Sequence, residues 1–296
     1  MFQGPTYCDR TVFREVCLLA ERTELTLGDE VSERTVHAPF AREVRDLPIE
    51  GHLETCLANL HRYYDAIASA FGDRVDTALS GGHDSRLTLA LCRAHGIRLS
   101  VHVYGNANDA DVRVAQAIAA TEGFPIEHVN KSDVKPVPPD AFAAMFERNL
   151  FGFQGHPADG VFENGTDLAT RLRRCAGGRV ALNGGGKVFR NFLYLPNRSL
   201  TVGQLLWMFK GALDLEWCTG AFDENVYLWN LGKKVKCVLD VEGDRLTHTD
   251  IKALYALFRC RYWMGKNNIV NNRFGPALTP FIDVNVVPDA VAIPLR

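Results

Sequence analysis

One short stretch of the chain combines residue types that could bind a phosphate group. Residues 80–85 read Ser-Gly-Gly-His-Asp-Ser and lie between a β-prone run, residues 75–79, and an amphipathic run, residues 85–95. Glycine lets a backbone come close to a ligand, and the first N–H groups of a helix attract an anion because they have no partner inside the helix. The pattern therefore predicts a strand, a phosphate-binding turn and a helix.

The side chains of this turn strengthen that interpretation. Ser80 and Ser85 offer hydroxyl donors, and Asp84 can hold a divalent cation against a polyphosphate. A simple serine-glycine turn with a helix N-cap is the alternative, but this combination of residues directly after a strand favours phosphate binding. His83 fills the remaining position, where we expect a solvent-facing side chain rather than a metal ligand or an acid/base group.

Residues 80–85 resemble the pyrophosphate-binding loop (PP-loop) of the ATP pyrophosphatase families. The sequence that follows narrows the resemblance to the synthetase domain of asparagine synthetase and to the related β-lactam synthetases. Five later segments carry this narrower resemblance, namely residues 99–105, 109–119, 126–129, 180–186 and 279–283. The resemblance covers roughly residues 50–296 and is most specific at residues 75–129.

The resemblance implies an α/β fold of the PP-loop, adenine nucleotide α-hydrolase-like type, with a parallel sheet covered by helices on both faces. The alternation of β-prone and helical runs over residues 74–131 indicates such a sheet as well, with ligands at the carboxyl ends of its strands. We expect a short β-rich lead-in at residues 1–50 and an asparagine-synthetase-like domain at residues 51–296, the last part of which is mainly helical.

The helices are predicted from apolar spacing. Apolar side chains recur every three or four positions over residues 51–71, which predicts a helix with one buried face. The members of this apolar stripe are Leu53, Leu57, Leu60, Tyr64 and Ile67. Further helices are expected at residues 140–150 and 167–175, and over much of residues 200–265.

In the resembled family, ATP activates a substrate carboxylate as an acyl-adenylate and releases pyrophosphate, and an amine then attacks to form an amide. The resemblance implies ATP and Mg²⁺ as cofactors of this chain. The residues expected to bind the nucleotide are Leu79, Ser80, Gly81, Gly82, Asp84, Ser85, Tyr104, Gly105, Gly184 and Gly185.

The resemblance also distributes roles among these residues. Residues 80–85 would bind the β- and γ-phosphates, the backbone of Leu79 and of residues 104–105 would hold the adenine, and residues 184–185 would lie near the α-phosphate. Asp84 would bind Mg²⁺. Asp111 either supports the metal site or, with Asp109, caps the helix that begins there.

Two features depart from the family pattern. Asparagine synthetases carry an acidic pair after the second glycine-rich loop, whereas this chain has Lys187 there. Lysine could replace a metal's charge as a point cation, or the loss of a carboxylate could mark a damaged site. The chain also stops at Arg296, before the segment where family members supply a catalytic lysine, so Lys187, Lys266 and Arg273 are the candidates for that role.

Two further regions are candidates for contact with a substrate. Residues 152–165 are rich in glycine and aromatic residues and include His156; a plain connecting loop is the alternative. Residues 261–273 combine four asparagines with Arg261, Tyr262 and Arg273 just before the Thr-Pro-Phe-Ile-Asp segment; a looped surface is the alternative.

Composition excludes several classes of protein. A chain of 296 residues with 47% hydrophobic residues is long enough to bury a substantial core. Its net charge of −2 gives no general reason to expect binding to nucleic acid, and the lack of an 18-residue apolar run predicts no membrane segment and a cytoplasmic location. The eight cysteines include no Cys-x-x-Cys pair, so we expect free thiols rather than a zinc or redox motif.

The sequence therefore predicts an ATP-dependent, AMP-forming amide or amine ligase that adenylates a small-molecule or peptide carboxylate. No glutaminase of its own is expected, because Phe2 follows Met1 where glutamine-dependent relatives expose a cysteine, and about 50 residues are too few for such a domain. The amine would be ammonia, a substrate amine or the product of a partner protein, and a homo-oligomer is left open.

One alternative is a tRNA-modifying enzyme that uses the same loop, which the lack of a basic stripe disfavours. The other is a degenerate nucleotide-binding protein that serves as a partner or scaffold in a biosynthetic complex.

Overall fold

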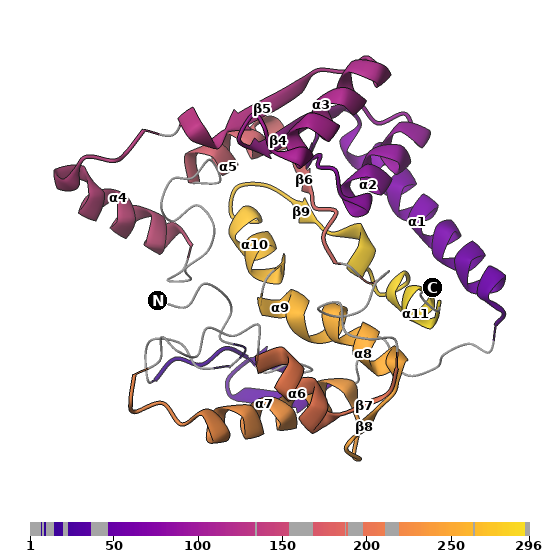
Figure 1. Ribbon diagram of the computed structural model, residues 1–296, viewed down its shortest axis with the longest axis vertical. Coiled ribbons are helices and arrows are strands. Elements are labelled where there is room, and N and C mark those ends of the chain that lie inside the picture. The colour runs from indigo at the N-terminus through magenta and orange to yellow at the C-terminus, as the bar shows by residue number, and fades with distance from the viewer. Residues whose placement is uncertain are drawn as a thin grey trace. The chain divides into compact units, whose positions relative to one another are not determined.

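The computed structural model of this chain (Figure 1) describes residues 7, 9, 15–19, 23–36, 47–133, 135–153, 168–186, 188, 198–210, 219–262 and 264–293. By its internal contacts the chain divides into two units, each built from segments that are distant in sequence. Unit 1 comprises Met1–Cys56, Lys187–Trp263 and Val284–Arg296, and unit 2 comprises Leu57–Gly186 and Met264–Asp283. The domain expected at residues 51–296 therefore includes parts of both units.

Unit 2 is an α/β unit built on a five-stranded, all-parallel sheet. Its strands are β3 (Val75–Ala78), β4 (Leu99–Gly105), β5 (Ile126–Asn130), β6 (Val180–Leu182) and β9 (Ala277–Leu278). Their order across the sheet is β5-β4-β3-β6-β9. The chain thus builds outward from β3 to β5, returns to the other side of β3 with β6 and continues to β9, which makes the boundary between β3 and β6 a topological switch point.

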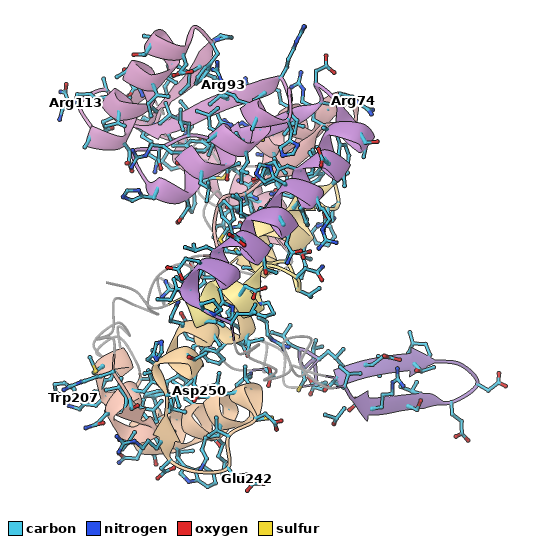
Figure 2. All side chains as sticks on the ribbon, turned by 90° about the vertical axis from the view of Figure 1, so that its right-hand side faces the viewer. Arg74, Arg93, Arg113, Trp207, Glu242 and Asp250 are labelled. Atoms are coloured by element: carbon cyan, nitrogen blue, oxygen red, sulfur yellow. The ribbon has the colours of Figure 1, made fainter. Side chains whose placement is uncertain are left out.

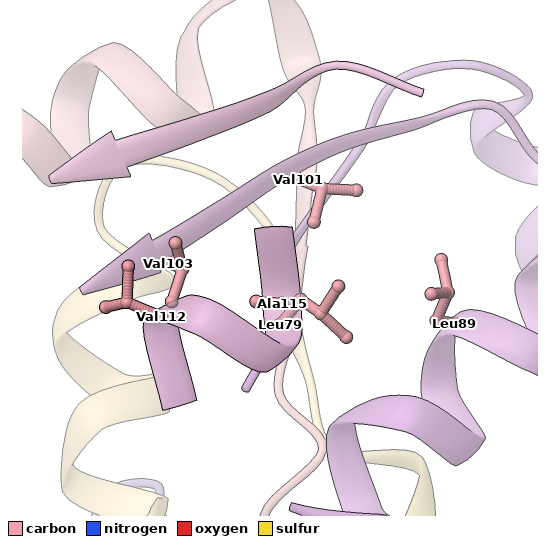
Figure 3. Close-up of a cluster of buried hydrophobic side chains, with 6 residues drawn as sticks. All are labelled: Leu79, Leu89, Val101, Val103, Val112 and Ala115. Atoms are coloured by element: carbon pink, nitrogen blue, oxygen red, sulfur yellow. The ribbon is translucent and has the colours of Figure 1, made fainter. Parts of the chain in front are cut away.

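Helices cover both faces of this sheet. On one face, Val101 and Val103 of β4 pack against Leu89 of α2 (His83–Ala94) and against Val112 and Ala115 of α3 (Ala110–Glu122), as Figure 3 shows. Because side chains alternate between the faces of a strand, Tyr104 of β4 lies on the opposite face. There the guanidinium of Arg174, from α5 (Leu168–Cys175), lies over its ring. Each fully buried apolar side chain contributes about 1.5–3 kcal/mol.

Helix α1 (Ile49–Phe71) confirms the helix expected at residues 51–71, but its buried face differs from the expected one near the amino end. The residues that are buried as expected are Leu60, Tyr64 and Ile67. Leu53 and Leu57 are 51% and 49% exposed, so their assignment to the buried face is wrong.

The buried positions at this end of α1 are His52 and Cys56, one residue earlier in each turn. His52 Nδ1 lies 2.9 Å from Asp289 Oδ1, and both side chains are buried. The apolar spacing could not identify this face, because one of its members is a polar side chain that is buried with a hydrogen-bonding partner.

Unit 2 has further elements outside the sheet. They are η1 (Lys131–Asp133), α4 (Pro139–Gly152), η2 (Ala176–Gly178), α10 (Met264–Asn271) and η6 (Pro280–Ile282). Phe153 and Val270 form a second buried cluster with Phe146, Leu168 and Phe274, which joins α4, α5 and α10. The helices expected at residues 140–150 and 167–175 are confirmed as α4 and α5.

Unit 1 is mainly helical, with an antiparallel hairpin near its amino end. The hairpin pairs β1 (Thr23–Leu27) with β2 (Val31–Thr35), so the β-rich lead-in is confirmed in this part. The other elements are β7 (Leu200–Thr201), α6 (Val202–Lys210), α7 (Glu224–Leu239), β8 (Arg245–Leu246), α8 (His248–Leu254), the π-helical η5 (Tyr255–Arg259), α9 (Cys260–Tyr262) and α11 (Val287–Ala292). Figure 2 shows the side chain of Trp207 projecting outward from α6, where it is 77% exposed.

Helix α8 begins with a capping box. Thr247 Oγ1 accepts a hydrogen bond from the Asp250 N–H, and Asp250 Oδ2 accepts one from the Thr247 N–H in return. Such reciprocal bonds satisfy donors that the start of a helix leaves unpaired. Within the described residues, no helix combines the length and the apolar character that crossing a bilayer requires.

Candidate functional site

The carboxyl edge of the sheet gathers the segments that the sequence identified as candidate binding loops. β3 is followed by residues 79–82 and then α2, β4 ends at Gly105, and β6 is followed by residues 183–186. Since all the strands are parallel, these segments lie at the same edge. The switch point between β3 and β6 makes the two glycine-rich loops neighbours, and this is where open α/β sheets bind their ligands.

The two serines of the first loop hold the turn in shape. Ser85 Oγ accepts a hydrogen bond from the Ser80 N–H at 3.1 Å, and the two hydroxyl oxygens lie 3.0 Å apart. Ser80 Oγ also accepts the N–H of Gly82 at 3.1 Å. Hydrogen bonds within the protein therefore form the turn that precedes α2.

The first glycine of this loop is approached by an acidic side chain from α3. Gly81 donates its N–H to Asp111 Oδ1 at 2.9 Å, and a Cβ on Gly81 would lie only 2.9 Å from the same oxygen. A larger residue at position 81 would therefore push the Asp111 carboxylate away. Asp109 is the N-cap residue of α3, but its side chain makes no capping bond and accepts the Asn106 N–H at 2.8 Å instead. No side-chain hydrogen bond of Asp109 caps the helix, but Asp111 lies in the first turn of α3, where the helix dipole favours an anion as expected.

The second glycine-rich loop packs directly on the first turn of α2. A Cβ on Gly184 would lie 2.9 Å from Thr88 Oγ1 and 3.2 Å from the backbone oxygen of Asp84. Thr88 is fully buried and donates its hydroxyl to the same Asp84 oxygen at 3.1 Å. Gly185 donates its N–H to Asn183 Oδ1 at 2.9 Å, which shapes the loop itself. Residues about 100 positions apart in sequence thus meet beside Asp84.

Asp84 is half-buried in the first turn of α2, and within the described ranges its carboxylate makes no hydrogen bond or ion pair. No group of three or more metal-ligating side chains occurs among the described residues. Mg²⁺ commonly takes only one or two protein carboxylates and completes its shell with phosphate oxygens and water. Asp84 alone could therefore contribute one carboxylate to a cation whose other ligands come from a phosphate group and water.

The ring of Tyr104 packs against the side chains of Arg174 and His102. The Arg174 guanidinium carbon lies 4.7 Å from the centre of the Tyr104 ring, and the His102 ring meets it edge-on at 5.1 Å. Asp76, in the middle of β3, lies 3.1 Å from His102 Nδ1. These contacts fix the Tyr104 ring on the face of the sheet that α5 covers.

Arg174 is a functional candidate that sequence analysis missed. Burial lowers the pKa of its guanidinium, and the negative charge of Asp76 opposes that shift. Its Nε and Nη2 are buried and have no hydrogen-bonding partner in the described part of the chain. A charged residue within a β-prone run, as Asp76 is, was the one sequence feature that could have pointed to a buried polar cluster here.

Of the three candidate catalytic cations, the structure describes two. Arg273 donates to the backbone oxygen of Gly152 at 2.8 Å, and Lys266 is half-buried in α10. Arg171 binds Asn271 and Asn267 at 2.7 and 3.2 Å. These asparagines thus serve contacts between α5 and α10.

The remaining candidate residues belong to unit 1 or lie outside the described residues. Arg261 and Tyr262 belong to unit 1, so the cluster expected at residues 261–273 is divided between the units. Lys187 lies outside the described residues, and so does the part of the candidate substrate loop from residue 154 onward, including His156.

Comparisons with protein-family models and with curated proteins both give no match for this chain. Conclusions about activity therefore depend on the site itself: a parallel α/β sheet with two glycine-rich loops meeting at its switch point.

Proposed function

We propose that this chain binds MgATP at the carboxyl edge of its sheet and uses it to adenylate a carboxylate substrate, as an AMP-forming amide or amine ligase of the asparagine-synthetase-like PP-loop group. The observation that carries the proposal is the packing of Gly184 against the backbone of Asp84 and the Thr88 hydroxyl. It joins the two loops that such a site requires, on either side of the switch point between β3 and β6.

In this proposal the loop residues bind and orient the polyphosphate. The N–H groups of Gly81 and Gly82, the hydroxyls of Ser80 and Ser85 and the amino end of α2 face the β- and γ-phosphates. Donors fixed before the reaction stabilise charge as it develops on the leaving pyrophosphate. Asp84 holds the magnesium ion, which supplies charge neutralisation on the phosphates.

The proposal also assigns residues to the adenine and to the α-phosphate. The backbone of Leu79 and of residues 104–105 holds the adenine, and Gly184 and Gly185 lie beside the α-phosphate, where the substrate carboxylate attacks. The nitrogen that completes the amide comes from ammonia, a substrate amine or a partner protein.

A calorimetric titration of MgATP into wild-type protein, Asp84→Ala and Asp73→Ala tests the binding step. Asp73 is an exposed acid that precedes β3, at the amino edge of the sheet, and is the matched control. Asp84→Ala should weaken binding at least tenfold, or about 1.4 kcal/mol, and Asp73→Ala should bind as the wild type does. Pyrophosphate exchange into ATP, screened over carboxylates, then tests adenylation; release of ADP rather than AMP would refute it.

One observation favours a second candidate, a nucleotide-binding protein without catalysis that acts as a partner or scaffold. Residues 183–186 read Asn-Gly-Gly-Gly, so this part of the second loop offers no carboxylate for a metal. Binding of MgATP by the wild type, together with no pyrophosphate exchange for any carboxylate and no release of AMP, would favour this candidate over the ligase.

A further inference from the structure

The contact between Asp111 and the first glycine of the loop has a consequence for what the loop can bind. We propose that Asp111 makes the loop selective for a polyphosphate complexed with a divalent cation, by holding a negative charge on a backbone donor that a phosphate oxygen would use. This inference rests on the proposed function, since it concerns the same phosphate-binding loop.

The backbone N–H groups of both loop glycines already donate hydrogen bonds to side chains of the protein. The Gly82 N–H is bound to the hydroxyl of Ser80, a neutral group that can turn aside. The Gly81 N–H is bound to Asp111 Oδ1 at 2.9 Å, a charged acceptor like the phosphate oxygen that the proposal assigns to this donor. An incoming phosphate must therefore either displace this carboxylate or bind next to it.

The Asp111 carboxylate is held at this position by its own helix. It lies in the first turn of α3, where the partial positive charge of the helix amino end stabilises an anion. The backbone of Gly81 supplies the other attraction, and it is available only because residue 81 has no side chain. Displacement by a metal-free polyphosphate would thus exchange one anion for another at the same donor.

Two further charged side chains lie near the loop among the described residues. Asp84 adds a second carboxylate, and the nearby Arg86 directs its Nε to the backbone oxygen of Gly82 at 3.3 Å and its Nη2 to His83 Nδ1 at 3.2 Å. Each like-charge pair at contact distance weakens binding by about fivefold even in water. A divalent cation bound to the phosphates removes this repulsion, because it brings positive charge between the two anionic groups.

The test is a titration of inorganic pyrophosphate into wild type, Asp111→Asn and Asp109→Asn, once with excess Mg²⁺ and once with EDTA. Asp111→Asn keeps an oxygen that can accept the Gly81 N–H and removes only the charge. Asp109→Asn is the matched control, because Asp109 is two residues away and accepts the Asn106 N–H rather than one from the loop. Magnesium titrated alone into the three proteins measures any binding of the cation without phosphate.

We expect the wild type to bind pyrophosphate at least tenfold more weakly in EDTA than with Mg²⁺. Asp111→Asn should gain about fivefold in affinity for the metal-free anion, so that a tenfold ratio between the two buffers falls to about twofold, while Asp109→Asn keeps the wild-type ratio. An unchanged ratio in Asp111→Asn, with binding of magnesium pyrophosphate intact in the wild type, would overturn the selectivity and leave the proposed function standing. No binding of pyrophosphate by any of the three proteins in either buffer would overturn the selectivity, and only a loss of MgATP binding by the wild type as well would overturn the proposed function.

Discussion

The side chain of Lys252 donates a hydrogen bond from Nζ to the backbone oxygen of Ala290 at 3.0 Å, and it also contacts the backbone oxygen of Ile293. Lys252 lies in α8 and is fully buried, and its partners lie at the carboxyl end of α11. A cation is favoured at a helix carboxyl end, yet both acceptors are neutral. Burial therefore lowers the pKa of Lys252 from 10.5 to about 8.

This pKa predicts an unusual dependence of stability on pH. Below about pH 8 the lysine is charged in both the folded and the unfolded chain, and the full penalty of burying the charge is present. Between about pH 8 and pH 10.5 the unfolded chain binds more protons, so the contribution of Lys252 to stability rises with pH. From pH 7 to pH 10 the gain should be about 2–3 kcal/mol relative to Lys252→Met.

Urea unfolding of the wild type, Lys252→Met and Lys233→Met at both pH values measures this gain. Lys233 is exposed on α7, so Lys233→Met serves as the control for removing a lysine at the surface. A constant difference in free energy of unfolding between the wild type and Lys252→Met across this pH range would contradict the prediction.

Five of the cysteines that the structure describes should separate into two classes by reactivity. Burial raises the pKa of Cys56 to about 11, and those of Cys92 and Cys260 to about 12, whereas Cys17 and Cys237 are exposed. The thiolate is the reactive form, so iodoacetamide at pH 8 should label Cys17 and Cys237 in the native protein and reach the other three only after unfolding. Peptide mass spectrometry after a short pulse reads out each site; labelling of Cys92 as fast as Cys237 in folded protein would argue against the observed burial.

Replacing Gly184 by alanine should damage both the fold and the candidate site. The new Cβ would lie 2.9 Å from Thr88 Oγ1 and 3.2 Å from the Asp84 backbone oxygen, so α2 or the second loop has to shift. Overpacking of this kind costs about 1–3 kcal/mol, and a shift of Asp84 should weaken MgATP binding as well.

Gly203→Ala is the control for this substitution. Gly203 lies in α6, and the nearest atom to its new Cβ is 3.9 Å away, so the change should be neutral or stabilise the helix by up to about 1 kcal/mol. Denaturation curves and MgATP titrations of both variants make the comparison. Equal stability of Gly184→Ala and wild type would mean that the two loops are not in contact.

The buried pair of His52 and Asp289 should behave as one unit. Either single replacement, His52→Leu or Asp289→Leu, leaves a buried polar group without its hydrogen bond, which costs about 1–3 kcal/mol. The double variant removes both groups, so it should be less destabilised than the sum of the two single variants. Thermal unfolding of the four proteins gives the coupling energy, and strict additivity would show that the pair does not interact.

The sequence predicted the local elements of unit 2 well, because its strands and helices alternate with clear changes of apolar spacing. Residues 75–79, 99–105 and 126–129 correspond closely to β3, β4 and β5. It did not predict β9, since a two-residue strand has no periodicity to detect, and it did not predict the short pair β7 and β8.

The side-chain environment of the candidate site was less predictable. The bond between Gly81 and Asp111 joins positions 30 residues apart, and its geometry depends on how α3 packs on the sheet. The packing of Arg174 over Tyr104 depends on which face α5 covers. The spacing of residues along the chain reports on one element at a time, so contacts between elements need the three-dimensional arrangement.

The position of β3 between β4 and β6 also determines when the candidate site can form during folding. β3, α2, β4, α3 and β5 follow one another closely in the chain and can pair as soon as that stretch is synthesised. By contrast, the hydroxyl of Thr77 reaches the carbonyl oxygen of Leu182, 105 residues further on. Contacts between such distant residues form slowly, because the intervening chain must first be ordered. The first glycine-rich loop is therefore expected to form before the second, and assembly of the candidate site should coincide with a late step of folding.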